Sequence, residues 1–412
     1  MKSVEQHVRD VLELADPLEP VGTGLLRAHG SVLALPVTSP VSLPPFDNSS
    51  MDGYAVVASD VAGATPETPV RLPVVADIPA GDTTTREIAP GRCARIMTGA
   101  PLPAGATAVV PVEGTDGATR EVTVTRAVRE GNAIRGVGED VEAGAEVLRA
   151  GVRLGAAELA VLAATGCDTV RTYPRPRVVV LSTGEELVEP GQPLGAGQIH
   201  ESNSFMLTAA AVDTGCEAER YGFIGDDPAT IASTLDGVLA RADLVLTTGG
   251  VSMGAYDAVK EVLSKRGTVR FEKVAMQPGM PQGAGVVGDA DTATPILTLP
   301  GNPVSSFVSF HLFARPLLDR MRGLDAGPPP TVRARLSAPV SSPSGKRSFL
   351  RAALDYDSTI EGAGYTVRPA TRQGSHQLSA LAGANALVVV PESVTELARG
   401  SIVDVLTLPG SP

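Results

Sequence analysis

Between residues 177 and 265 the chain alternates short apolar strands with helices, and this alternation limits the possible folds more than any other feature of the sequence. Strands are predicted at 178–181, 218–223 and 244–247, and helices at 204–213, 228–240 and 256–265. Strands that alternate with helices form βαβ units, in which helices cover both faces of a parallel sheet. The sequence therefore predicts a three-layer parallel α/β domain.

Two other regions lack this alternation and are predicted to form β structure. Short strands separated by Pro and Gly are expected between residues 44 and 140, at 54–58, 70–75, 94–97, 108–112 and 121–125. After a stiff Gly-Pro-Pro-Pro linker, strands are expected at 331–336, 386–390 and 402–406. Closely spaced strands without a helical period are typical of small all-β modules.

Helices are predicted near the N-terminus and after the first β region. Ser3 is a candidate helix cap with Gln6 three residues later, which predicts a helix at about 3–14. A shorter helix is expected at 23–29. A helix at 156–164 should end at Gly166, because glycine readily adopts the left-handed conformation that closes many helices.

Length and composition exclude several classes of protein. A chain of 412 residues suggests two to four domains. The net charge of −12 and the small number of aromatic residues argue against a general nucleic-acid-binding protein. The start lacks an apolar leader and no apolar stretch is long enough for a membrane span, which predicts a cytoplasmic protein. Cys93, Cys167 and Cys216 have neither disulfide nor zinc-site spacing.

Three Gly-rich loops follow predicted strands of the α/β domain, including a strand at 296–299. Because ligands of open parallel sheets bind beyond the carboxyl ends of the strands, these loops should converge on one site. Backbone N–H groups and hydroxyls in such loops suit a phosphate or another oxyanion. The candidate ligand-binding residues are Ser182, Gly184, Thr248, Gly249, Gly250, Ser252, Gly301 and Asn302.

Carboxylates beside these loops could hold Mg²⁺ that bridges to phosphate oxygens, and the candidates are Glu186, Asp226 and Asp257. Two acidic residues also have simpler interpretations. Asp226 precedes Asp227-Pro228, so its role could be to cap a helix and not to bind a metal. Asp52 precedes Gly53, and Asp-Gly is a common hairpin turn.

A competing motif is G-x-S-x-G at 250–254, which in serine hydrolases places a nucleophile between a strand and a helix. His311 or His376 could then serve as the base. Against this reading, Gly249-Gly250 adds an anion-binding turn that such a nucleophile does not need. No residue identifies which histidine would act, and the histidines lack the spacing of a zinc enzyme.

Four sequence strings, in order along the whole chain, carry a family resemblance. They are PFDNSSMDGYA at 45–55, RIMTGA at 95–100, GGVS at 249–252 running to Asp257, and LPGNPVS at 299–305. Together they closely resemble the molybdopterin molybdenumtransferases, the family that includes the gephyrin E domain.

The resemblance implies a particular architecture. It suggests a split helical domain at 1–43 with 141–173, a β module inserted at 44–140, an α/β domain at 174–325 and a C-terminal β domain at 326–412. It also implies an elongated homodimer, in which the α/β domain of one subunit and the inserted β module of the other form the active site.

The implied reaction converts adenylylated molybdopterin and molybdate into molybdenum cofactor and AMP, with Mg²⁺ assisting. Anion-binding loops and carboxylates that hold a metal are what this chemistry requires. Glu186 and Asp257 are the expected metal ligands. The positions that the resemblance marks as functional are Asp52, Thr98, Arg135, Asp140, Glu186, Asp226, Asp257, Lys273, Pro300, Pro303 and Ser375.

One string departs from the family pattern. Where the family often reads K-P-G-K-P, this chain has Gln277, Pro278, Gly279, Met280 and Pro281, so that only Lys273 remains in this neighbourhood. The loss of two cations predicts weaker binding of an anionic ligand. It leaves open a second hypothesis, a gephyrin-like dimeric scaffold that binds a receptor or cell-division partner, with reduced or no catalysis.

Overall fold

The computed structural model describes residues 1–225, 227–250, 258–288, 293–356 and 364–408. The chain divides into two compact units. The first unit contains Met1–Val21, Gly30–Ala34 and Arg171–Pro412, and the second contains Gly22–His29 and Leu35–Val170.

A six-stranded mixed sheet forms the centre of the first unit, in the order β15-β12-β16-β20-β19-β17. Its strands β15, β12, β16 and β20 are parallel, as predicted, whereas β19 is antiparallel to both of its neighbours. The prediction of a wholly parallel sheet is therefore wrong at this edge. Short connections join β17 to β19 and β19 to β20, and without a crossover helix such connections give antiparallel pairs. The strand bounds are β12 Arg177–Thr183, β15 Glu217–Ile224, β16 Leu244–Thr248, β17 Arg270–Lys273, β19 Pro281–Val287 and β20 Thr294–Leu299.

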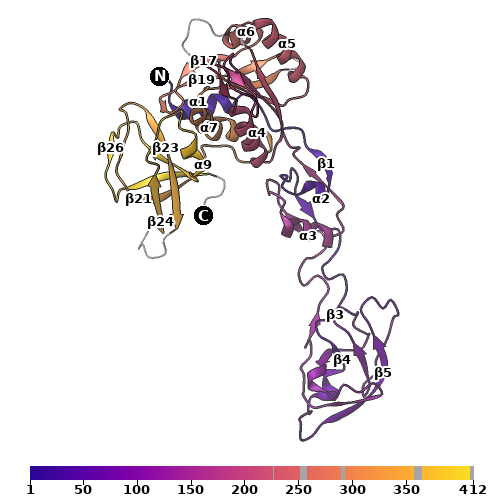
Figure 1. The fold of residues 1–412 in the computed structure, drawn as a ribbon. Coiled ribbons are helices and arrows are strands. Elements are labelled where there is room, and N and C mark those ends of the chain that lie inside the picture. The colour runs from indigo at the N-terminus through magenta and orange to yellow at the C-terminus, as the bar shows by residue number, and fades with distance from the viewer. Residues whose placement is uncertain (226, 251–257, 289–292, 357–363, 409–412) are drawn as a thin grey trace. The chain divides into compact units, whose positions relative to one another are not determined.

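Helices cover both faces of this sheet, which confirms the three layers (Figure 1). Successive side chains of a strand point to opposite faces. Val178 and Val180 accordingly pack with α1, α4, α7, η3 and α8, while Val179 and Leu181 pack with α5 and α6. The bounds are α1 Val4–Leu12, α4 Asn203–Asp213, α5 Pro228–Leu239, α6 Ala258–Arg266, α7 Pro303–Ser309, the π-helical η3 Phe310–Ala314 and α8 Arg315–Met321.

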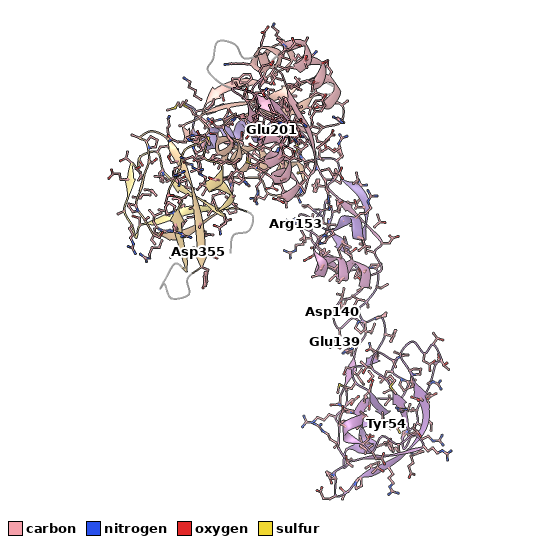
Figure 2. All side chains as sticks on the ribbon, in the orientation of Figure 1. Tyr54, Glu139, Asp140, Arg153, Glu201 and Asp355 are labelled. Atoms are coloured by element: carbon pink, nitrogen blue, oxygen red, sulfur yellow. The ribbon has the colours of Figure 1, made fainter. Side chains whose placement is uncertain are left out.

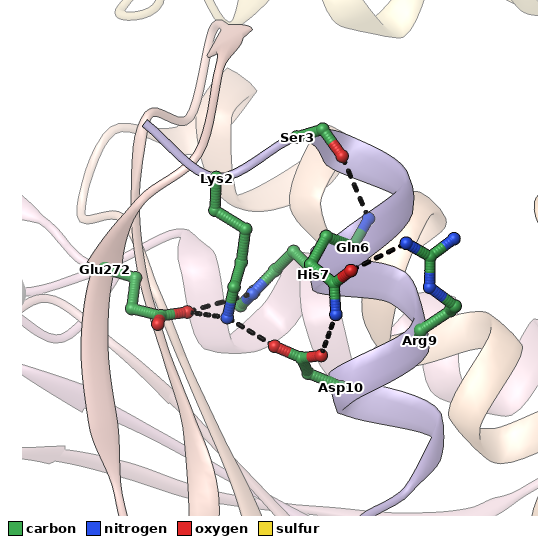
Figure 3. Close-up of polar contacts among 7 residues, drawn as sticks. All are labelled: Lys2, Ser3, Gln6, His7, Arg9, Asp10 and Glu272. Carbon is green, nitrogen blue, oxygen red and sulfur yellow. Dashed lines mark hydrogen bonds and ion pairs between the residues drawn. The ribbon is translucent and has the colours of Figure 1, made fainter.

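The N-terminal helix α1 begins where the sequence predicts, because the Ser3 side chain accepts a hydrogen bond from the Gln6 N–H. Polar contacts tie this end of the chain to β17: Lys2 contacts both Asp10 and Glu272 (Figure 3). His7 lies beneath them, and burial lowers its pKa to about 4. The helix is thus fixed to the sheet by ion pairs on its rim and apolar packing below.

The C-terminal strands close into a barrel, because β23 pairs with both β24 and β25 while β21 and β27 complete the ring. The short strand β18, Met276–Gln277, pairs with β23 and so joins the barrel to the α/β layer. The sequence predicted β21, β25 and β27 but missed β23 and β24. The bounds are β21 Thr331–Leu336, β22 Val340–Ser341, β23 Arg347–Tyr356, β24 Tyr365–Pro369, α9 Ser379–Ala382, β25 Ala386–Val390, β26 Glu396–Leu397 and β27 Ile402–Thr407.

The second unit contains a five-stranded sheet in the order β7-β4-β6-β5-β8, and each predicted strand of this region is present. Helix α3, Ala156–Ala164, is followed by Gly166 with φ +80°, as expected. The helix expected at 23–29 is a single turn, α2 Leu25–Ala28. The strands are β4 Gly53–Val56, β5 Val70–Ile78, β6 Cys93–Ile96, β7 Ala108–Pro111 and β8 Glu121–Val124. Shorter elements of the two units are β1 Val21–Gly24, β2 Val37–Thr38, β3 Asn48–Ser49, η1 Ala58–Val61, η2 Val112–Gly114, β9 Ile134–Arg135, β10 Glu146–Leu148, β11 Thr169–Thr172, β13 Leu187–Val188 and β14 Ile199–His200.

Gly53 is required by a close backbone approach. It opens β4, and a Cβ at this position would lie 2.0 Å from the Val110 carbonyl oxygen of β7. The interpretation of Asp52-Gly53 as a hairpin turn is therefore wrong. None of the helices in the described parts of the chain is long and apolar enough to cross a membrane.

Candidate functional site

A cavity of about 670 Å³ lies at the carboxyl ends of β12, β16 and β20. The three Gly-rich loops do converge here, together with the first residues of α4. The cavity is lined by Ser182, Thr183, Gly184, Glu186, Leu187, Ile199, His200, Glu201, Ser202, Asn203, Thr248, Gly249, Gly250, Gly301, Asn302, Pro303 and His376. This position is the usual ligand site of an open α/β sheet.

Two glycines of the lining are needed for close packing. Gly249 has φ +90°, and a Cβ there would lie 2.5 Å from the Thr183 carbonyl oxygen. Gly184 has φ +151°, and a Cβ there would lie 2.6 Å from Oε2 of Glu186. A side chain at either position would displace backbone or the Glu186 carboxylate, so these glycines fix the shape of the cavity.

Glu186 is the described acidic residue best placed to bind a ligand or metal. It lines the cavity, and its carboxylate has no hydrogen bond or ion pair within the described ranges. Asp226, Ser252 and Asp257 lie outside the described residues. The Thr230 N–H donates to Asp227 Oδ2 at 2.8 Å, so the neighbouring Asp227 caps α5.

The hydroxyl groups of the strand ends are used within the protein. Ser182 Oγ donates to Glu201, Thr183 Oγ1 to the Thr248 carbonyl, and Thr248 Oγ1 to the Pro300 carbonyl. In this structure these three hydroxyls therefore have partners within the protein. Within the described ranges the lining also contains no Lys or Arg.

Lys273 and the 277–281 segment lie at the same edge of the sheet as the cavity. Lys273 pairs with Pro281, and Gly283, two residues further along β19, pairs with Thr298 of β20. Pro281 thus lies level with Pro300, at the carboxyl end of β20. The exposed Lys273 side chain is the cation of this segment.

The loop that contains Ser375 also reaches the site. The Ser375 carbonyl accepts a hydrogen bond from the Val304 N–H at 3.2 Å, directly after Pro303, and His376 lines the cavity. His311 instead packs between Phe307 and Phe310, and burial lowers its pKa to about 3. Of the two histidines weighed for a hydrolase, only His376 lies at the cavity.

Asp52 and Thr98 lie together in the second unit. Oδ1 of Asp52 accepts hydrogen bonds from the Thr98 N–H at 2.7 Å and the Thr98 hydroxyl at 2.8 Å. These bonds hold the pKa of Asp52 below its usual value. Arg135 pairs with Asn48 across β9 and β3, and the Asp140 N–H donates to the Leu43 carbonyl. Both side chains are exposed, and no described contact links them to Asp52.

Sequence reasoning missed two residues of the site, Glu201 and Asn203. Glu201 lies just before α4 (Figure 2), and its carboxylate accepts a hydrogen bond from the Ser182 hydroxyl. Asn203 Nδ2 donates to Thr248 Oγ1 at 2.9 Å and to the Gly301 carbonyl at 2.7 Å. The only sequence signal was their place at the start of a predicted helix, which says nothing about long-range partners.

Comparison with known families covers most of the chain. A model described as "MoeA N-terminal region (domain I and II)" matches residues 2–166. A second, "Probable molybdopterin binding domain", matches residues 179–320. A third, "MoeA C-terminal region (domain IV)", matches residues 333–408.

Individual relatives agree over the full length. A curated protein of Mycobacterium tuberculosis named "Molybdopterin molybdenumtransferase 2" is 48% identical and covers 99% of this chain and 100% of its own length. A "Molybdopterin molybdenumtransferase" of Nostoc sp. is 38% identical over 93% of this chain and 88% of its own. A solved structure titled a molybdopterin biosynthesis moeA protein, from Pyrococcus horikoshii, has a TM-score of 0.82 at 31% identity and covers 99% of both chains.

These matches place the fold and its cavity in the class of multidomain α/β proteins that contain a molybdopterin-binding domain. The chain belongs to the MoeA family, whose curated members in Mycobacterium tuberculosis and Nostoc sp. are named molybdopterin molybdenumtransferases.

Proposed function

We propose that this protein is a molybdopterin molybdenumtransferase, which inserts molybdenum from molybdate into adenylylated molybdopterin and releases AMP during molybdenum cofactor biosynthesis. Full-length similarity to relatives of that name, at up to 48% identity, is the observation that carries the proposal. The cavity supports it, because three strand-end loops and a carboxylate meet where such a ligand would bind. No comparison supports the scaffold hypothesis.

We propose that this cavity binds Mg²⁺ together with the substrate. Glu186 supplies a carboxylate with no described partner, and carboxylate oxygen is a preferred ligand of Mg²⁺. We propose that Glu186 and Asp257 hold the ion, with Asp226 close to the phosphates. When bound, the ion would neutralise charge on the phosphoanhydride of the substrate. The lack of described Lys or Arg in the lining makes such a cation more necessary.

Backbone groups and one lysine would meet the rest of the anionic charge. Gly249, Gly250 and Gly301 line the cavity and bring main-chain atoms close to a ligand. Lys273 lies at the same sheet edge, so it is the proposed contact for phosphate or molybdate. Pro300, Pro303 and Ser375 shape this edge, and the Ser375 carbonyl fixes the start of α7.

The remaining parts of the proposal follow from the family resemblance. We propose the four-part division predicted above, and the matches to 2–166, 179–320 and 333–408 support three successive regions of it. We also propose a cytoplasmic homodimer in which Asp52 and Asp257 act from different subunits. Thr98, Arg135 and Asp140 would then assist Asp52.

Complementation tests this function. The gene is expressed in a molybdotransferase-null strain, and the activity of a molybdoenzyme is measured with a vector-only control. Restored activity at ordinary molybdate concentrations supports the proposal. A stably expressed protein that restores none, although a known family member does so in the same strain, would contradict it.

A further inference from the structure

Glu201 is a buried carboxylate in the wall of the cavity, with a side chain only 1% exposed. Three hydrogen bonds reach it. Oε1 accepts the Ser182 hydroxyl at 2.7 Å and the Ser204 N–H at 2.8 Å, and Oε2 accepts the Ser204 hydroxyl at 2.5 Å. The Glu201 carboxylate is thus the acceptor in each of these three hydrogen bonds.

Arg220, which is not among the residues that line the cavity, balances the charge of this carboxylate. Its Nε donates to Ser204 Oγ at 2.7 Å, and its Nη2 lies 3.6 Å from Oε2 of Glu201. The Arg220 guanidinium also lies 3.9 Å above the Phe205 ring centroid and pairs with Glu189. A buried carboxylate is stable only when it is paired and hydrogen-bonded, and Glu201 meets both conditions.

This network determines what Ser182 offers to a ligand. A serine hydroxyl has one proton to donate and two lone pairs that accept. Because the Ser182 proton points to Glu201, the oxygen can only accept a hydrogen bond from the cavity. A charged phosphate oxygen is also a hydrogen-bond acceptor, so it would face the lone pairs of the Ser182 oxygen and find no proton there.

The neighbouring strand end is arranged in the same way. Thr248 Oγ1 accepts from Asn203 Nδ2 and also lies within hydrogen-bond distance of the Pro300 carbonyl and of the Ser306 hydroxyl, so its partners too are inside the protein. Asn203 and Glu201 are separated by one residue at the start of α4. This short segment therefore contacts the ends of both β12 and β16.

We propose that Glu201 is a positioning residue that makes Ser182 a hydrogen-bond acceptor, so that this part of the cavity binds an N–H or O–H donor of the ligand and not its phosphate oxygens. The proposal rests on the proposed function, because it assigns a part of that substrate to Ser182. The amino and ring N–H groups of the pterin are donors of this kind. The phosphate part of the ligand then lies towards Gly249, Gly250 and Gly301 and towards Lys273.

The test measures two ligands separately in the full-length protein, under anaerobic conditions. Molybdopterin carries the pterin N–H donors, and inorganic pyrophosphate carries phosphate oxygens without any N–H group. Ser182→Ala removes the acceptor, and Glu201→Met removes the carboxylate at similar volume. Glu201→Gln keeps a carbonyl oxygen for the Ser182 proton. Ser204→Ala is the matched control, since it breaks the same network without touching Ser182.

Loss of one hydrogen bond should weaken molybdopterin binding about 3- to 10-fold in Ser182→Ala and in Glu201→Met. Pyrophosphate affinity should stay within about twofold. Glu201→Gln should recover most of the molybdopterin affinity that Glu201→Met loses, and Ser204→Ala should retain it. In the Ser182→Ala background, Glu201→Met should cause no further loss, because Glu201 acts through Ser182.

Equal molybdopterin affinity in wild type and Ser182→Ala would overturn the inference, as would a loss confined to pyrophosphate. If Glu201→Met does not fold, the molybdopterin affinities of Ser182→Ala and Glu201→Gln still test the inference. These outcomes differ from failure of the proposed function, in which wild type would bind neither ligand.

Discussion

The Asp52 carboxylate and Thr98 are joined by two hydrogen bonds to the same oxygen, one from the Thr98 backbone and one from its hydroxyl. Both donors favour the ionised carboxylate, which is why the pKa of Asp52 is lowered. An exposed aspartate with two dedicated donors is held in one orientation, as expected of a functional carboxylate.

Thr98→Val should raise the pKa of Asp52 towards its usual value, because the hydroxyl donor is lost while the backbone donor remains. Thr98→Ser is the matched control and should leave the pKa low. Since the folded pKa is depressed, any stability that this pair provides is present above the ordinary pKa and is lost as pH falls through the folded pKa, below 3.8. NMR titration of the carboxyl carbon measures this directly. An unchanged pKa in Thr98→Val would show that the hydroxyl bond contributes nothing.

Substitutions at the adjacent residues Asp226 and Asp227 should have different effects, one on turnover and the other on stability. Asp227→Ala removes the cap of α5 and should lower the melting temperature with little effect on turnover. Asp226→Ala should leave the melting temperature unchanged and reduce turnover, if Asp226 acts at the phosphates. Thermal melting and AMP release are measured on both variants. If Asp227→Ala reduced turnover and Asp226→Ala only lowered the melting temperature, the functional role would belong to Asp227 and not to Asp226.

The shape of the cavity can be tested at one glycine. Gly249→Ala places a Cβ against the Thr183 carbonyl at positive φ, so we expect loss of activity and lower stability. Gly237→Ala is the control: it lies in α5, and nothing is within 4 Å of its added Cβ. This change should raise stability by roughly 0.5–1 kcal/mol and leave turnover intact. Full activity in Gly249→Ala would mean that the β16 loop does not approach the ligand.

The two missing lysines give a prediction of gained affinity. One charge-assisted hydrogen bond contributes about 1.5–3 kcal/mol, or roughly 10- to 150-fold in affinity. Gln277→Lys with Met280→Lys should therefore tighten binding of adenylylated molybdopterin or molybdate and raise turnover at low substrate. Calorimetric titration of wild type and double variant measures this. Tight wild-type binding that the lysines do not improve would show that backbone N–H groups or arginines already meet the charge.

Local patterns predicted most elements of the fold because they depend on neighbouring residues. The Ser3 cap, the Ala156–Ala164 helix and the apolar run of β12 are of this kind. The antiparallel strand β19 and the barrel strand β23 were not predicted, since their pairing depends on distant segments.

The candidate site was predicted in position but not in chemistry. The carboxyl-edge rule placed the loops at Gly184, Gly249 and Gly301 correctly. It could not predict the partner of the Ser182 hydroxyl, which donates a hydrogen bond to Glu201, nineteen residues away. Composition and spacing identify which donors exist, but only the folded chain determines where they point.

Molybdate-dependent release of AMP from adenylylated molybdopterin tests the central claim most directly. Purified protein with Mg²⁺ should release AMP and form cofactor that activates an apo-molybdoenzyme. Glu186→Gln should lose this turnover, or require far more Mg²⁺, while it keeps the wild-type melting temperature. If folded wild-type protein bound the substrate yet released no AMP at saturating Mg²⁺ and molybdate, the proposed function would be contradicted.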